Sequence, residues 1–600
     1  RAHAPAWARP GKGTAVALAA TLLVALGLWR FSLTQTDVSE LSGFGLAGAL
    51  HATYWIALAL LTAGFFASLR GGPRPGPWPA AYVIGLIVVE RATQAVLYPT
   101  PLYAWAWKHD AVVDYFLTHD VARPRPELGL MDAYNEWPGF FAVQAGLLRM
   151  TGVENTLQYM AWWPLVSNLM LLPALLLAFR VFTRDQRLVW TGAWIFYAAN
   201  WVGQDYFSPQ SVAYLFWLAI IAIVLRRFQR PEHPGAARNA PQRVLWTLAL
   251  LPLVALLAAS HQLTPPMLMA CLLALCLTRR YRNWMILVFV IEVVGAWNVS
   301  AAQIFLREQI PALIEGIGNV KGNVETGVGA TPTGRGPVFA SWMSRLLTAV
   351  VFLLAAYGVW RRPALRKQAW PLVLLGLAPA PMIVANGYGS EMLFRVVLFM
   401  LPWAAFFAAA ALLPRATTEP PAYPARAHRW PVATLRIRWA VSGAVVLAMT
   451  CAFVPAYAGK DKLSYFPPEE ANLVKKVYDH APEGSLIAAP NRNFAYAYDK
   501  YWRFEPGYWF LEEPLTHIRK IEANPAKTLA TDLSAVKKPG RAYLVFSDGI
   551  YSNASMNGEM SEERLRRIEK SVAESKQFIK RWGNDHARVY ELKGPGRAAR

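Results

Sequence analysis

The sequence predicts a polytopic α-helical membrane protein with about 13 transmembrane helices and a small C-terminal α/β domain. Of its 600 residues, 55% are hydrophobic and only 16% are charged, whereas soluble proteins average about 25% charged residues. The charges are missing from windows of roughly 20 residues, the length that crosses a hydrocarbon core of about 30 Å. The last part of the chain has ordinary soluble composition. We therefore expect a transmembrane domain over residues 1–457 and an extracytoplasmic α/β domain over residues 458–600.

Hydropathy sets the position of each expected transmembrane helix. In chain order the spans are 14–33, 46–69, 78–97, 157–182, 188–202, 211–225, 244–260, 263–277, 284–305, 346–360, 369–385, 394–413 and 439–457. Two connections between them are long, residues 98–156 and residues 306–344. An odd number of spans places the two ends of the transmembrane domain on opposite sides of the membrane.

Arginine clusters give the expected orientation. They fall in every second connection, and the short connections that alternate with them contain no Lys or Arg. The arginine-free connections lie near 34–45, 204–211, 261–266 and 386–393. Because cytoplasmic loops carry the excess of basic residues, the N-terminus is expected in the cytoplasm and the C-terminal domain outside. The same pattern explains the net charge of +22 without a nucleic-acid partner.

Both long loops are expected on the outer face. Loop 98–156 ends in YNEWPGFFAVQAGLLRMTG, where apolar residues at helical spacing predict an interfacial amphipathic helix that begins near Trp137. Loop 306–344 is Gly-rich (EGIGNVKGNVETGVGATPTGRG). It is either a plain connector or a loop that gates access of a substrate.

The C-terminal domain has the pattern of a small α/β unit. Residues 484–490, 541–548 and 587–593 are short β-branched and aromatic runs that predict strands. The segment SEERLRRIEKSVAESKQFIKRW, residues 561–582, predicts an amphipathic helix with charged pairs at helical spacing. The domain has no Gly-rich phosphate loop, nucleophile elbow or zinc-ligand spacing.

The leading catalytic candidates lie in WKHDAVVDYFLTHD, within loop 98–156. If this segment is helical, Asp110 and Asp114 lie one turn apart on one face, next to Lys108 and His109. Two neighbouring carboxylates can separate their pKa values, which leaves one as a base near neutral pH. The alternative is a solvated acidic face of an outer helix.

Three more outer turns carry polar residues that can contact a substrate. They contribute Asp205 and Tyr206 in GQDYFSPQ, His261 in SHQLTPP, and Glu391 and Arg395 in NGYGSEMLFR. The first turn contacts a substrate or is simply a structured turn, and the histidine binds a phosphate or caps its turn. The last two residues have the spacing of a helical ion pair, and an arginine can also bind phosphate in a bidentate manner. Within the spans, Glu90 and Arg91 are expected to form structural pairs or line a cavity.

This series of motifs resembles that of the GT-C superfamily of integral membrane glycosyltransferases, in particular actinobacterial members. The resemblance rests on KHDAVVDYFLTHDVARP, YNEWPGFFAVQAGLLRMTG, NWVGQDYFSPQ, SHQLTP and YGSEMLFRVVLFMLP, and covers most of the membrane region. It implies a plasma-membrane enzyme that transfers a hexose or pentose from a polyprenyl-phosphate donor. The acceptor would be a glycan, lipid or protein of the cell envelope. In many members the acidic loop follows the first span, and this makes Asp37, in TDVSELSG, the reserve candidate for the base.

The implied reaction inverts the anomeric carbon. Asp110 or Asp114 would deprotonate an acceptor hydroxyl, which attacks that carbon as the lipid phosphate leaves. Lys108, His261 and Arg395 are the candidates to stabilise the phosphate. The sequence has no Asp-x-Asp motif of the kind that holds a nucleotide and metal. No metal ligands are assigned, although a divalent ion held by outer carboxylates stays open.

Two other functions fit the composition. One is a flippase or exporter of lipid-linked saccharides, and the other is a polymerase or ligase that joins whole glycan units. The odd span count, the absence of internal repeats and the large outer domain all disfavour a flippase. Transfer in vitro from a defined polyprenyl-phosphate sugar separates these functions, because a flippase forms no glycosidic bond.

Overall fold

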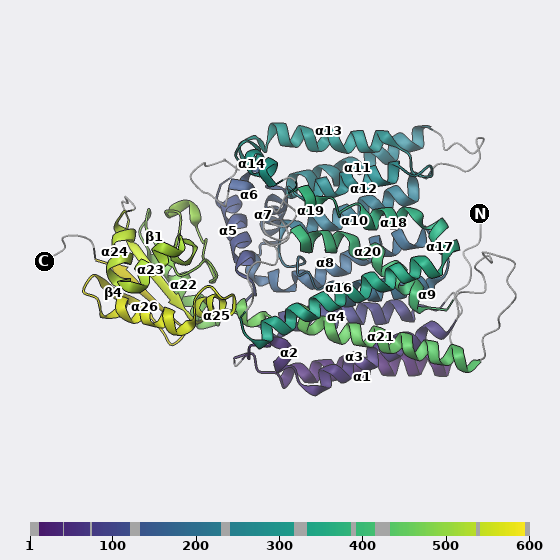
Figure 1. Cartoon of the computed structure of the whole chain (residues 1–600), viewed down its shortest axis with the longest axis horizontal. Helices are drawn as coiled ribbons and strands as arrows, with labels where there is room; N and C mark the ends of the chain where they lie inside the picture. The colour runs from purple at the N-terminus through teal and green to yellow at the C-terminus, as the bar shows by residue number, and fades with distance from the viewer. Residues whose placement is uncertain are drawn as a thin grey trace.

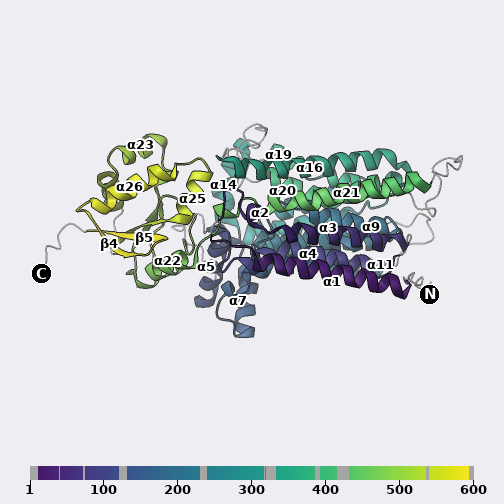
Figure 2. The ribbon, with the colours of Figure 1, turned by 90° about the horizontal axis from the view of Figure 1, so that it is seen from below.

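The computed structural model shows a long helical bundle with a smaller α/β domain at one end (Figure 1). It describes residues 11–39, 41–71, 75–119, 132–229, 240–316, 318, 333–385, 392–414, 432–535 and 540–593. The bundle helices run roughly along the long axis of the molecule, and the α/β domain extends that axis (Figures 1 and 2).

The bundle and the helices at its ends follow in chain order. They are α1 (Lys12–Thr34), α2 (Leu46–Ala49), α3 (Ala52–Ser68), α4 (Trp78–Leu97), α5 (Ala104–Thr118), α6 (Asp132–Glu136), α7 (Gly139–Thr151), α8 (Trp163–Arg180), α9 (Gln186–Ala199), α10 (Pro209–Arg227), α11 (Ala240–Ser260), α12 (Thr264–Cys276), α13 (Trp284–Ser300), α14 (Gln303–Gly316), α16 (Arg335–Arg361), α17 (Pro363–Gln368), α18 (Trp370–Leu377), α19 (Met382–Ala385), α20 (Met392–Leu412) and α21 (Val432–Ala458).

Every expected span coincides with a helical segment. Among the described residues, seven helices are long and apolar enough to cross a membrane, and five shorter helices are apolar; α9 supplies the remaining span. The predicted fold class is therefore confirmed. Three spans differ in detail, since 46–69 is divided into α2 and α3, 284–305 into α13 and the start of α14, and 369–385 into α18 and α19. The first division occurs because His51 has an extended backbone, and its side chain caps α3 by accepting from the Thr53 amide.

α9 and α20 form the centre of the bundle. Every residue of α9 from Arg187 to Ala199 is buried, as expected for a helix surrounded by other helices. α16 approaches α20 closely at Gly358, where an added Cβ atom would lie 2.0 Å from the carbonyl oxygen of Phe407. Small residues allow such close approach of helix backbones inside membranes.

The connections divide between the two ends of the bundle. α5, α6, α7 and α14 lie at the end that carries the α/β domain, and α17 and the start of α1 lie at the opposite end (Figures 1 and 2). At that opposite end, Arg180, Arg184, Arg226 and Arg227 line one cavity. The arginine-rich connections thus gather away from the α/β domain, in agreement with the alternation seen in the sequence. Which end faces the cytoplasm stays a prediction.

α7 corresponds to the expected interfacial helix. It begins at Gly139 after Pro138 and projects to the side of the bundle, at the end that faces the α/β domain (Figure 2). Val143, Leu147 and Met150 expose apolar side chains on it. An exposed apolar face suits a helix that lies in the membrane interface. Most of the Gly-rich loop, 319–332, lies outside the described residues.

The C-terminal domain contains a five-stranded sheet in the order β2-β1-β3-β5-β4. Its elements are α22 (Pro468–His480), β1 (Leu486–Ala489), β2 (Tyr508–Trp509), α23 (Leu515–Ala523), α24 (Pro525–Ala535), β3 (Ala542–Ser547), α25 (Asp548–Met556), α26 (Glu562–Glu574), β4 (Phe578–Gly583) and β5 (Ala587–Leu592). β1 pairs in parallel with β2 and β3, and β5 pairs antiparallel with β3 and β4.

The predicted helix over 561–582 is wrong in its second half. α26 ends at Glu574 and Ser575 is extended, after which residues 578–583 form β4. Aromatic and β-branched side chains favour this strand, and pairing with β5 satisfies its backbone. Exposed Lys580 and Arg581 lie on this edge strand, where charge discourages pairing with other chains. β2 was also missed, because a two-residue strand leaves too short a pattern to recognise.

The α/β domain is fixed to the bundle just after α21. Asp461 accepts hydrogen bonds from Gln94 Nε2 at 2.9 Å and from the Tyr98 hydroxyl at 2.9 Å. The Tyr103 amide donates to the Ser464 carbonyl at 3.1 Å. These contacts hold the domain against the C-terminal end of α4 and the start of α5, so that α5 lies at the junction.

Candidate active site

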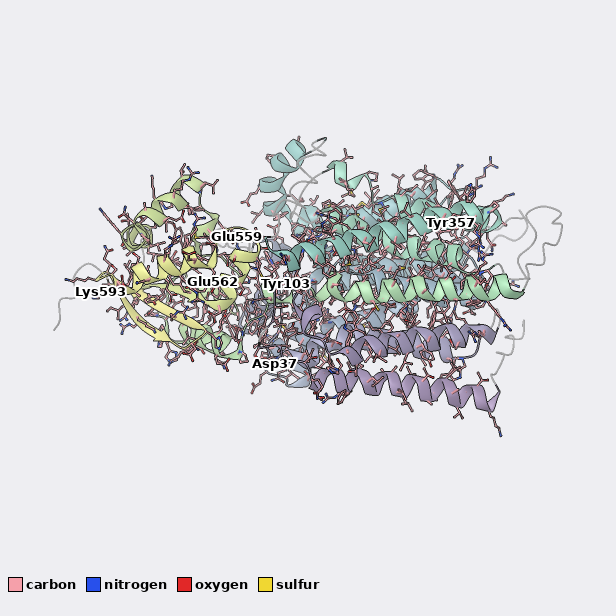
Figure 3. The ribbon with its side chains drawn as sticks, turned by 60° about the horizontal axis from the view of Figure 1, so that its bottom comes forward. Asp37, Tyr103, Tyr357, Glu559, Glu562 and Lys593 are labelled. Atoms are coloured by element: carbon pink, nitrogen blue, oxygen red, sulfur yellow. The ribbon has the colours of Figure 1, made fainter. Side chains whose placement is uncertain are left out.

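α5 carries the leading catalytic candidates and lies between the bundle and the α/β domain. The segment is helical, so Asp110 and Asp114 share a face, as predicted for a helix. Tyr103 precedes the helix with φ of 75°, and Figure 3 shows it at the junction of the two parts. The buried side of α5 packs on Phe140 and Phe141 of α7 and on Tyr501 of the α/β domain.

Asp110 is held by one strong hydrogen bond. The Thr156 hydroxyl donates to Asp110 Oδ1 at 2.5 Å. Burial raises the pKa of Asp110 to about 7; the Thr156 hydrogen bond opposes this, and the negative charges of Asp499 and Asp114 add to it. A carboxyl with a pKa near neutral can exchange a proton at physiological pH, as a general base must.

A third carboxylate comes from the α/β domain. Asp499 has a pKa of about 6, raised first by burial and further by Asp114, while Lys500 and Lys475 lower it. Burial also raises the pKa of Asp114, against the same two lysines. Asp110, Asp114 and Asp499 thus form one electrostatically coupled group from two parts of the chain. Within the ranges described, no three His, Cys, Asp or Glu side chains are placed to hold a metal ion.

Aromatic side chains of the α/β domain cover this face of α5. Tyr496 contacts Trp107 edge to face with ring centroids 4.5 Å apart, and Tyr501 stacks on Tyr115 at 5.7 Å. Tyr103, Tyr496 and Lys500 are the described non-glycine residues with positive φ, and all adjoin the site. Backbone in this region costs about 1–3 kcal/mol per residue and concentrates at functional sites. This segment was not among the predicted site residues, although its aromatic run NFAYAYDKYW was an available signal.

His109 is a neutral, structural residue. Its Nδ1–H donates to the Phe207 carbonyl at 2.7 Å, so Nε2 is the acceptor for the Tyr134 hydroxyl at 3.1 Å. Burial lowers the pKa of His109 to about 3. The ring stacks on Tyr206 at 5.6 Å. The histidine therefore joins loop 98–156 to the turn before α10, with both nitrogens occupied by protein groups.

Lys108 lies in an aromatic cage. Its Nζ is 4.2 Å from the ring centroid of Trp105, 5.0 Å from that of Tyr134 and 4.9 Å from that of Tyr498. The side chain is 1% exposed, and burial holds its pKa well below the usual range, with Arg492 acting in the same direction. This enclosed position does not offer the amine to a lipid phosphate.

Asp205 forms a buried ion pair with Arg91. Arg91 Nη1 lies 3.0 Å from Asp205 Oδ2, which also accepts from Asn168 Nδ2 at 2.7 Å. The Tyr457 hydroxyl donates to the other oxygen at 3.0 Å. Both carboxylate oxygens are thus bound by protein donors, which favours the structured turn over substrate contact for Asp205.

Tyr206, the residue after Asp205, lines a cavity of about 180 Å³ at the end of the bundle that carries the α/β domain. Tyr103 meets the ring of Tyr206 edge to face at 4.8 Å, and Tyr98 and Tyr457 also line the cavity. The cavity adjoins the start of α5, because Tyr103 and Ala106 also line it. Of the two residues predicted in this turn, Tyr206 is thus the one that faces open space.

His261 and Arg395 are close in space. The Thr264 amide donates to His261 Nδ1 at 3.2 Å, so this histidine caps α12. Its pKa is held well below the ordinary value by burial, then by the charges of Arg395 and His109. The structure therefore gathers the arginine, this turn and loop 98–156 at one end. Glu391 lies outside the described residues.

The reserve candidate, Asp37, is in a different environment. The Ser39 amide and hydroxyl donate to its Oδ1 at 2.8 and 2.7 Å. These hydrogen bonds lower its pKa, which makes it a weaker base than Asp110. Figure 3 shows Asp37 at the same end of the bundle as Tyr103.

Known structures provide a comparison at the level of the fold. The chain is similar to the Archaeoglobus fulgidus oligosaccharyltransferase, with a TM-score of 0.48 and 9% identity over 82% of this chain and 72% of that one. It is also similar to ArnT from Cupriavidus metallidurans, solved bound to undecaprenyl phosphate, with a TM-score of 0.48 and 12% identity over 86% and 98% of the two chains. No family model and no curated protein matches the sequence.

Proposed function

We propose that the chain is a membrane glycosyltransferase that uses Asp110 as general base to transfer one sugar to an acceptor hydroxyl. The donor is a polyprenyl-phosphate hexose or pentose, and the acceptor is a glycan, lipid or protein of the cell envelope. The reaction takes place at the end of the bundle that carries the α/β domain, outside the plasma membrane. The proposal rests mainly on Asp110, a partly buried carboxyl with a pKa of about 7 at the junction of two domains.

The environment of Asp110 suits proton abstraction. Thr156 binds Oδ1, and we assign Oδ2 to the acceptor hydroxyl. In the ionised state this oxygen takes the hydroxyl proton as the acceptor oxygen attacks the anomeric carbon. The bond from that carbon to the phosphate oxygen breaks on the opposite side, and the lipid phosphate keeps the electron pair. Inversion of the anomeric carbon follows from this single displacement.

The leaving phosphate needs positive charge close to the membrane surface. We assign this role to Arg395. It lies at the start of the long apolar helix α20, and its charge is close enough to His261 to lower the pKa of that histidine. An arginine stays charged and can bind two phosphate oxygens at once. The neutral His261 ring keeps Nε2–H as a donor, since Nδ1 accepts from Thr264. Lys108 and His109 are assigned to positioning loop 98–156 rather than to the phosphate.

The test is sugar transfer by the purified full chain from a radiolabelled polyprenyl-phosphate sugar, with envelope fractions as acceptors. Asp110→Asn keeps the shape and the Thr156 contact but cannot take a proton, so turnover should fall about 10²–10⁴-fold. Asp37→Asn is the matched control and should keep normal turnover. Thermal unfolding of each variant verifies that the fold is retained.

Four results would contradict the proposal. If Asp110→Asn retains near-normal transfer, the base is wrongly assigned. If Asp37→Asn alone abolishes transfer, the reserve candidate is the base. If the wild type forms no glycosidic bond with any polyprenyl-phosphate sugar but moves such lipids across vesicles, the protein is a flippase; transfer of whole glycan units instead of one sugar indicates a polymerase or ligase.

A further inference from the structure

A groove far from the candidate active site lies on the side of the bundle between α3 and α21. It encloses about 770 Å³ and is lined mainly by small or apolar side chains. These are Ala59, Thr62, Ala63, Phe66, Trp439, Ala440, Gly443, Ala444 and Leu447. The two helices run side by side, at the edge of the bundle (Figures 1 and 2). Ala63, Ala440 and Ala444 are exposed, so the groove opens to the surroundings of the bundle, which for a membrane span are lipid.

Two arginines close the groove at the arginine-rich end of the bundle. Arg70 follows the end of α3, and Arg436 lies near the start of α21; both are exposed and both line the groove. Next to them the rings of Phe66 and Trp439 pack edge to face, with centroids 6.0 Å apart, and connect the two sides of the groove. Among the described residues, neither arginine has an ion-pair partner and the groove has no acidic lining residue. Their two positive charges therefore lack a protein counter-ion in the described part of the chain.

The groove has the length of one membrane leaflet. Ala59 and Arg70 are eleven positions apart, and so are Arg436 and Leu447. At 1.5 Å per residue both walls extend about 16 Å, close to half of a hydrocarbon core of about 30 Å. A chain lying in the groove would therefore span from the arginines to the middle of the bilayer.

We propose that this groove binds one phospholipid with an anionic headgroup, taken from the leaflet at the arginine-rich end. The headgroup phosphate lies between Arg70 and Arg436, and one acyl chain fills the small-residue groove toward Leu447. Arginine pairs favour phosphate because each guanidinium can form two parallel hydrogen bonds. Basic pockets between membrane helices favour anionic lipids for the same electrostatic reason. The site is independent of the transfer reaction proposed above.

Native mass spectrometry of the purified full chain in detergent tests the site. Phosphatidylglycerol or phosphatidylcholine is titrated in, and bound lipid is counted at each concentration. The wild type should bind one phosphatidylglycerol in preference to phosphatidylcholine. Arg70→Gln with Arg436→Gln should weaken that binding about thirtyfold, and Arg70→Gln alone about fivefold. Arg279→Gln with Arg282→Gln removes the same charge from exposed positions at the same end, outside the groove, and should change nothing.

A second variant tests the acyl chain. Ala444→Phe fills the groove while both arginines remain, and it should also weaken phosphatidylglycerol binding. Equal affinity for the two lipids overturns the proposal, as does unchanged binding by Arg70→Gln or by the double arginine variant. Unchanged binding by Ala444→Phe overturns the groove as the position of the acyl chain. A loss in the Arg279→Gln, Arg282→Gln control equal to that in the groove variant shows general charge attraction and also overturns the specific site.

Discussion

Thr156→Val offers the sharpest test of the role of Asp110, because it changes the pKa of the base without removing it. The Thr156 hydroxyl stabilises the ionised carboxylate through a 2.5 Å hydrogen bond, and valine has nearly the same shape without a donor. A hydrogen bond to a charged group is worth about 1.5–3 kcal/mol, and one pKa unit corresponds to about 1.4 kcal/mol. The pKa of Asp110 should therefore rise from about 7 by about 1–2 units.

The sign of the effect follows from which form is active. The base must be ionised, and about half of Asp110 is ionised at pH 7 in the wild type when its pKa is about 7. A higher pKa lowers that fraction, so kcat/KM at pH 7 should fall about 5–50-fold and recover as the pH rises above about 9.

The assay is kcat/KM for sugar transfer across the pH range, which reports ionisations of the free enzyme. Thr118→Val is the matched control. Thr118 lies on α5 with Asp110, but its hydroxyl donates to the backbone carbonyl of Asp114 and not to a carboxylate. Its pH profile should match the wild type. A uniform loss in Thr156→Val at every pH, with the midpoint unmoved, would refute the reasoning, because it would mean that the threonine supports structure and not the ionisation of Asp110.

Three further predictions concern topology and stability. Cysteine at Ser561, exposed on the α/β domain, should react with an impermeant reagent in intact cells, and cysteine at Arg282 should not; the reverse pattern would invert the orientation. Asp205→Asn should lower stability by about 3–5 kcal/mol, because it leaves the charge of Arg91 buried and uncompensated, and a small shift in thermal unfolding would show that the pair is unimportant. Burial raises the pKa of Glu470 to about 8 from an ordinary value of 4.5, so the folded state binds its proton more tightly than the unfolded state does. The stability that this group contributes is therefore lost as the pH rises from about 5 to about 8. The unfolding free energy of Glu470→Gln should depend less on pH, and the same pH dependence in both proteins would contradict the burial argument.

Local sequence patterns predicted most of the helices and strands, but they did not predict which side chains contact one another in the site. Periodicity placed Asp110 and Asp114 on one face of a helix, and the structure has that helix. The environments of Lys108 and His109 could not be predicted from the same segment. They depend on groups from elsewhere in the chain, such as the ring of Tyr498 and the carbonyl of Phe207. A residue next to a candidate base looks equally functional in sequence whether it faces a substrate or an aromatic cage.

The sequence by itself determined the class of the protein, the number of its spans and the division of its connections between two ends. Hydropathy and the placement of arginines are properties of continuous segments, and the bilayer acts on each segment separately. Only the tertiary structure decided that Arg91 neutralises Asp205 and that Asp499 of the α/β domain lies within electrostatic range of Asp110. Desolvation and charge coupling depend on groups that folding brings together from distant parts of the chain, so the pKa of a buried carboxylate is fixed by the fold.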